Sequence, residues 1–174
     1  MRVAVIMDPS ASCAVGSPGR HDLRGDPQAL GRVEPAGRYP ALRAFLAHLN
    51  AADSPFSTFG CEVWSAVEAG ASQAHVFASR VGVVFLREAD NMAQKPLASV
   101  AHRLAELLQR ESEFLWAELL ISPAIFPEER AGYCLQLSLY ARGATSSQAE
   151  VRWGLGMAHT QQALFFVARE LLRE

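Results

Sequence analysis

Two tryptophans of the chain each lie two residues from a glutamate, Glu62 with Trp64 and Trp116 with Glu118. Both pairs occur in segments typical of β-strands, where residues i and i+2 point to the same face of a sheet. Carboxylates beside large aromatic rings indicate a surface that is neither plain core nor plain solvent-exposed sheet. Such a surface can form half of a dimer interface, line a ligand-binding cleft or serve as an amphipathic outer wall.

A later segment, 133–142, adds two polar side chains to this set. Gln136 and Tyr140 alternate with leucines there, so strand register can bring them onto the same face as the tryptophans. His75, in phase with Phe77, is a further candidate, more readily a core or interface histidine than a catalyst. Enrichment of Trp and Tyr at interfaces favours an interface. The ligand or interface candidates are Glu62, Trp64, His75, Trp116, Glu118, Gln136 and Tyr140.

Motifs of known catalytic chemistry are missing from the sequence. The five histidines never form HExxH, and Cys13, Cys61 and Cys134 are far apart without CxxC spacing, so we expect no metal and no cofactor. GxSxG, SxxK and glycine-rich phosphate loops are also missing. Gly154 and Gly156 are expected to allow close approach of another backbone or to mark a kink. The sequence therefore leans toward a protein without enzymatic activity.

Composition points to one globular domain of 174 residues, with 50% hydrophobic and 20% charged residues. The net charge of −2 and the scattered arginines favour neither nucleic acid nor membrane as a partner. The apolar run at 3–7 is too short for a signal peptide, and the unpaired cysteines suit a reducing compartment. We therefore expect a cytoplasmic protein.

The apolar patterns predict the following elements. A short strand at 3–7 is followed by residues 9–38, rich in Gly, Pro, Ser and Arg, which we expect to be a mobile loop or linker. A helix at 40–50 precedes strands at 59–68 and 73–87, with a bulge or bend near Gly82. A second helix covers 96–108, its apolar stripe centred on Leu104. Strands at 114–121 and 133–142 flank a loop, and the last helix starts at a capping box formed by Ser147 and Glu150.

The predicted fold is α+β, a largely antiparallel sheet of four to five strands with three helices in the order β-αββ-αββ-α. From Pro40 onward this order is similar to that of type III secretion chaperones, which are small dimeric α+β proteins. We expect a non-enzymatic protein-binding or assembly protein of adaptor or chaperone type, acting as a homodimer or with a protein partner. The alternative is a small-molecule-binding protein or small enzyme with its site on the aromatic sheet face, covered by the 9–38 loop.

Overall fold

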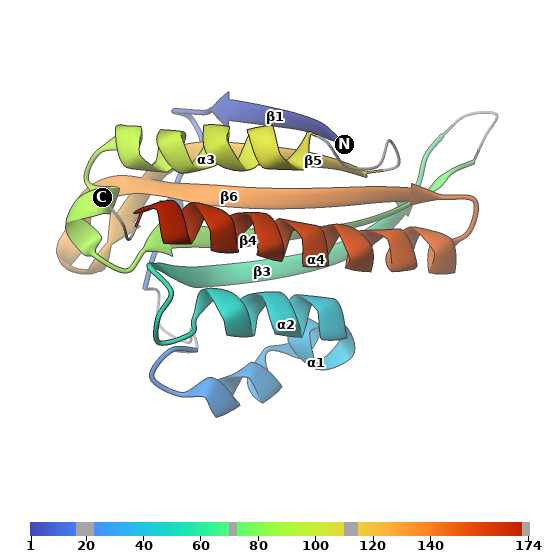
Figure 1. The fold of residues 1–174 in the computed structure, drawn as a ribbon, viewed down its shortest axis with the longest axis horizontal. Coiled ribbons are helices and arrows are strands. Elements are labelled where there is room, and N and C mark those ends of the chain that lie inside the picture. Colours follow the sequence, from blue (N-terminus) through green and yellow to red (C-terminus); the bar gives the residue numbers. More distant parts are fainter. Residues whose placement is uncertain (17–22, 70–72, 110–114, 172–174) are drawn as a thin grey trace.

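The computed structural model describes residues 1–16, 23–69, 73–109 and 115–171, which form one sheet with helices packed on it (Figure 1). Part of the expected hairpin turn, at 70–72, and the expected strand start at 114 lie outside the described residues. The strands and α-helices, in chain order, are β1 (Arg2–Met7), β2 (Cys13–Ala14), α1 (Glu34–Arg38), α2 (Pro40–Leu49), β3 (Phe56–Val67), β4 (His75–Phe85), α3 (Gln94–Leu108), β5 (Leu115–Phe126), β6 (Arg130–Gly143) and α4 (Ser146–Leu171).

The sheet contains six strands within the described residues, with β1, β5, β6, β4 and β3 side by side in that order. Its four strands from β5 to β3 are antiparallel neighbours, whereas β1 and the two-residue β2 both run parallel to β5. The α+β class is confirmed, but the sheet is mixed and larger than the largely antiparallel one expected. Alternation identifies a strand without identifying its neighbour, and β1 meets its partner only after more than a hundred intervening residues.

Helices α2, α3 and α4 cover one face of the sheet (Figure 1). The stripe predicted for α3 is confirmed, because Leu97, Val100, Leu104 and Leu108 are all buried. Inward side chains of the central strands complete the core; β6 contributes Leu135, Leu137, Leu139 and Ala141. A short helix that the sequence did not predict, α1, precedes α2.

The N-terminal turn of α4 is capped two residues earlier than expected. The Oγ1 of Thr145 accepts from the backbone N–H of Gln148, and the side chain of Gln148 accepts from the N–H of Ala144. The arrangement is close to a capping box of Thr145 and Gln148, not of Ser147 and Glu150, but the Gln148 side chain accepts from Ala144, one residue before the N-cap. The helix buries Trp153, Met157 and Leu164, while Val151, Leu155 and Phe166 on its other side stay more than half exposed.

Residues 9–38 carry more structure than their composition indicates. The described parts contain β2, a 3-10 turn at Pro27–Arg32 and helix α1, and they bury Leu23, Ala29, Leu30 and Ala36. The mobility expected of this segment stays a prediction. The loop expected after residue 121 is wrong, because β5 continues through Pro123 to Phe126.

The irregularity expected near Gly82 lies on the neighbouring strand. The register of β3 against β4 shifts between Phe59 and Cys61, where Gly60 takes a φ of 60°. Gly82 lies opposite Phe59, and a Cβ at Gly82 would come within 2.3 Å of the Phe59 carbonyl oxygen. A glycine is therefore required beside the bulge. No helix of the described residues is long and apolar enough to cross a membrane.

Candidate functional site

One face of the sheet carries no helix within the described residues, and we call its central part the open face. Strand register sets out its side chains in three rows across β1, β5, β6, β4 and β3. The central row is Arg2, Trp116, Tyr140, Ala78 and Trp64. The second row is Ala4, Glu118, Ser138, Arg80 and Glu62. The third row is Ile6, Leu120, Gln136, Gly82 and Phe59.

Six of the seven candidate residues lie on this face, and the two tryptophans share its central row. His75 does not join them, because it is in phase with the buried Phe77 on the helix-covered face. The sequence indicated the aromatic and carboxylate members of the face and, by the alternation along 133–142, placed Ser138 with Gln136 and Tyr140, but it missed Arg80. The two-residue phase of Arg80 with Ala78 was the signal that could have found it.

The three rings of the central row, on β5, β6 and β3, contact one another in a line that spans four strands, because β4 lies between β6 and β3. Trp116 and Tyr140 stack with centroids 4.8 Å apart, and Trp64 meets Tyr140 edge-on at 5.8 Å. Two guanidinium groups lie over the outer tryptophans, Arg142 at 4.9 Å from the Trp116 ring and Arg80 at 5.8 Å from the Trp64 ring. Each is a cation–π contact. The row therefore forms an ordered aromatic ridge, not a set of independent exposed rings.

Hydrogen bonds hold the polar groups around this ridge. The Tyr140 hydroxyl donates to Glu118 Oε2 at 2.8 Å, and the Arg80 Nε donates to Ser138 Oγ at 3.3 Å. Partial burial, followed by the bond to Glu118, raises the pKa of Tyr140 above its ordinary value. The phenol is therefore neutral and acts as a donor at neutral pH, which suits a structural or binding role.

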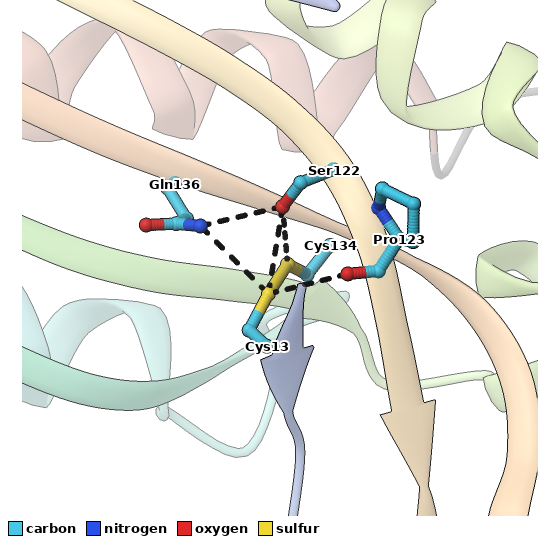
Figure 2. The surroundings of a disulfide bond; sticks show 5 residues. All are labelled: Cys13, Ser122, Pro123, Cys134 and Gln136. Atoms are coloured by element: carbon cyan, nitrogen blue, oxygen red, sulfur yellow. Dashed lines mark hydrogen bonds between the residues drawn. A yellow bond between two sulfur atoms is a disulfide. The ribbon is translucent and has the colours of Figure 1, made fainter. Parts of the chain in front are cut away.

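A disulfide crosses the end of the open face beyond the third row (Figure 2). It joins Cys13 at β2 to Cys134 on β6, 121 residues later, and so corrects the expectation that the cysteines are unpaired. The fold causes the pairing. Because β2 pairs with the edge of β5, the side chain of Cys13 extends past Ser122 on β5 and reaches Cys134 on β6. No spacing rule in the sequence could reveal it.

Gln136, the sixth candidate, belongs to the surroundings of this disulfide. Its Nε2 donates to Ser122 Oγ at 3.3 Å and lies 3.8 Å from Cys13 Sγ. Beside it is a cavity of about 210 Å³, lined mainly by Cys13, Phe59, Glu62, Arg80, Gly82 and Gln136. The cavity connects the disulfide with the charged second row of the open face.

Cys61, the free cysteine of the described residues, faces the helix-covered side of the sheet. Burial, with help from the carboxylates of Glu62 and Glu34, raises the pKa of its thiol to about 11. A thiol that stays protonated at neutral pH is a poor nucleophile. Among the described residues no group of three His, Cys, Asp or Glu side chains is placed to hold a metal ion.

Comparison of the chain with models of known protein families, with curated proteins and with solved structures found no match.

Proposed function

We propose that the chain is a non-enzymatic protein-binding protein that assembles as a homodimer through its open face. The observation that carries the proposal is the composition of that face, an aromatic ridge flanked by balanced opposite charges. Arg2 and Arg80 are matched in number by Glu62 and Glu118 on the three rows. Nucleic acids and anionic membranes require an excess of basic groups, so a polyanion is a poor fit.

The rows are complementary to themselves under a twofold rotation. If the axis runs along β6 in the plane of the interface, β5 of one copy lies over β4 of the other and β1 lies over β3. In the second row this places Glu118 opposite Arg80 of the second copy, and the symmetry repeats the pair. In the central row it places Arg2 opposite Trp64 of the second copy, a cation–π pairing.

Side-chain size adds no support for this rotation. Trp116 lies opposite Ala78 and Leu120 lies opposite Gly82, but Ala78 is fully buried and the Phe59 ring lies over Gly82, so neither position is an open recess. Arg142 would meet its own copy near the axis, but its charge is offset by Glu68, to which its Nε donates at 2.8 Å. Two sheets packed face to face also cross at about 30°, so the correspondence is closest near Tyr140 and loosens toward the edges.

The area of the face is adequate for a modest dimer. Five strands about 4.8 Å apart and six residues rising about 3.3 Å each give a projected area on the order of 500 Å², before side-chain relief is counted. A standard interface buries about 800 Å² per partner. The exposed apolar side of α4, with Val151, Leu155 and Phe166, lies on the opposite side of the sheet, so it is available to bind another protein but cannot add to this interface.

The rival function, a small-molecule-binding protein or enzyme on this face, has weaker support. The cavity of about 210 Å³ beside Cys13 is smaller than the roughly 300–1,000 Å³ typical of sites for drug-sized ligands. Residues 9–16 cover only the end of the face beyond the third row, leaving the aromatic ridge uncovered. The expected cytoplasmic location is also a proposal, and the disulfide weighs against it because such bonds are rare in reducing compartments.

Light scattering after gel filtration tests the dimer. We expect a mass near twice 18.9 kDa for the wild type and a shift toward one chain for Trp116→Glu. Arg80→Glu and Glu118→Arg should each weaken association at least tenfold, because each places two like-charged pairs in the interface. The double variant restores opposite charges and should recover association. Arg43→Glu, a matched change at an exposed arginine of α2, should have no effect.

The outcomes test self-association and the proposed docking geometry separately. A wild-type protein that stays monomeric at all concentrations contradicts the homodimer. A stable dimer that is insensitive to both single charge reversals contradicts the docking along β6 while leaving self-association intact. Thermal melts of each variant show whether a lost dimer reflects only a lost fold.

A further inference from the structure

The disulfide between Cys13 and Cys134 is the strongest single link between residues 9–16 and the sheet. β2 supplies just two paired residues, and one further backbone bond joins the Val15 N–H to the Ile125 carbonyl at 2.8 Å. Cys13 and Val15 also pack on a small apolar cluster separate from the main core, formed by Phe59, Val84, Ala124, Phe126 and Cys134. Breaking the disulfide therefore removes a large part of what holds this segment over the end of the open face.

The two sulfur atoms differ in their accessibility to a reagent. Cys134 is fully buried at 0% exposure, whereas Cys13 is partly exposed and lines the cavity of about 210 Å³. Thiol–disulfide exchange requires a thiolate to reach the sulfur that it attacks, while the other sulfur leaves. Accessibility therefore assigns Cys13 as the attacked sulfur and Cys134 as the leaving group.

A hydroxyl donor is already placed at the leaving sulfur (Figure 2). Ser122 Oγ lies 3.4 Å from Cys134 Sγ and 3.5 Å from Cys13 Sγ. The Gln136 amide donates to this oxygen, so the hydroxyl proton of Ser122 remains available to point toward a sulfur. A hydrogen bond to a developing thiolate stabilises it, and a better-stabilised thiolate leaves faster.

The cavity walls indicate the class of thiol. Arg80 and Glu62 place a positive and a negative charge at its rim, and Gln136 adds an amide. A thiol derived from an amino acid offers a carboxylate of opposite charge to Arg80 and an ammonium group of opposite charge to Glu62. The volume of about 210 Å³ suits a group of the size of cysteine.

We propose that Cys13 is a modification site at which small amino-acid-derived thiols form a mixed disulfide. The incoming thiolate sulfur bonds to Cys13 Sγ, the bond to Cys134 Sγ breaks, and Cys134 leaves as a thiolate. Cys134 then takes up a proton equivalent to the one that the incoming thiol lost. One disulfide replaces another, so the step needs no oxidant. Residues 9–16 lose their covalent link to β6.

The test uses free cysteine as the probe on the full-length Cys61→Ser variant, in which Cys13 and Cys134 are the remaining cysteines. Samples are quenched with acid at intervals, alkylated with N-ethylmaleimide and analysed by intact mass and peptide mapping. We expect one added cysteine on the peptide with Cys13 and one maleimide group on Cys134. The added cysteine on Cys134, or two maleimide groups before any thiol is added, overturns the assignment.

Two sets of variants test the roles of the neighbouring side chains. Arg80→Gln with Glu62→Gln should slow adduct formation with free cysteine several-fold but leave the rate with neutral 2-mercaptoethanol unchanged. Ser122→Ala should slow both thiols, because it removes the donor to the leaving sulfur. Equal slowing of both thiols by the charge variants contradicts the proposed class of thiol.

The site shares Arg80 and Glu62 with the proposed dimer face, so the reaction is also measured on Trp116→Glu. Faster modification of that variant means that a second copy covers the cavity and supports both proposals. Equal modification in both proteins supports the thiolation site alone. As a control, the same thiol is shown to reduce the Cys13–Cys134 disulfide in guanidinium chloride. If neither folded protein, wild type or Trp116→Glu, reacts with it, the thiolation site is overturned and the dimer proposal is unaffected.

Discussion

Trp116 and Tyr140 stack face to face on neighbouring strands, with ring centroids 4.8 Å apart and ring planes within 1° of parallel. The two residues are direct partners in the register of β5 and β6, so the stack is a consequence of strand pairing. Cross-strand aromatic pairs of this kind contribute about 0.5–1.5 kcal/mol beyond area burial. The same two rings occupy the centre of the proposed interface, which links the stability of the sheet to binding at its surface.

Variants of Tyr140 separate the hydrogen bond from the stack. Tyr140→Phe removes the donor to Glu118 but keeps the ring, and we expect it to lower the unfolding free energy by about 1 kcal/mol. Tyr140→Ala also removes the ring contacts with Trp64 and Trp116 and should lower it by about 2–4 kcal/mol. Urea denaturation followed by tryptophan fluorescence measures both. Equal losses for the two variants would mean that the ring contributes nothing.

Two glycines of α4 offer a matched pair. A Cβ at Gly156 would lie 3.0 Å from a Leu139 methyl and 3.1 Å from a Leu115 methyl, whereas one at Gly154 would make only an ordinary contact at 3.8 Å with Ala41. Gly154→Ala should raise the unfolding free energy by about 0.5–1 kcal/mol through helix propensity. Gly156→Ala should lower it by about 1 kcal/mol because of overpacking. Thermal melts that rank the variants the other way contradict this packing.

A buried hydrogen bond joins α4 to the sheet. The Trp153 indole N–H donates to Ser79 Oγ at 2.9 Å, and both residues are almost fully buried. Ser79→Ala leaves the indole without this acceptor and should lower the unfolding free energy by about 1–3 kcal/mol. Adding Trp153→Phe removes the orphaned donor, so the double variant should lose less than the sum of the two single changes. Strict additivity in this cycle would show that the bond is not formed.

The face assignment of α3 is tested by Leu104 and His102. Leu104 is fully buried, whereas His102 is exposed. Leu104→Asp should prevent folding, because an unpaired carboxylate in the core costs several kcal/mol. His102→Ala should change the melting temperature little. Circular dichroism melts compare the two variants. Similar melting temperatures would show that the buried face of α3 is assigned wrongly.

The Cys61 thiol makes stability depend on alkaline pH. Its pKa rises from an ordinary 9.0 to about 11 in the folded protein, so the unfolded chain loses this proton first. The contribution is therefore fully present below pH 9 and is lost as the pH rises through 11. Between these values the wild type should lose more stability than Cys61→Ala. Urea midpoints at pH 8, 10 and 11 measure the difference, and parallel pH curves would contradict the raised pKa.

Local sequence patterns were sufficient to predict most of the helices and strands and the side-chain phase within each. The α3 stripe around Leu104 was readable because helical spacing repeats every three to four residues and depends on no distant contact. The phase that puts Glu62 with Trp64, and Trp116 with Glu118, was readable because strand side chains alternate strictly. Even the capping of α4 was recognisable as a motif, although two overlapping matches differed by two residues and only the hydrogen bonds of Thr145 and Gln148 distinguish them.

Which strands are neighbours could be seen only in the folded chain. The parallel pairing of β1 with β5, the row that brings Arg80 between Glu62 and Ser138, and the link from Cys13 to Cys134 all join residues remote in sequence. The secondary-structure propensity of a segment does not predict such pairings, because the free energy that stabilises them comes from burying a whole face of the sheet against α2, α3 and α4. The open face exists because these helices all pack on the other side, which no single segment of the chain specifies.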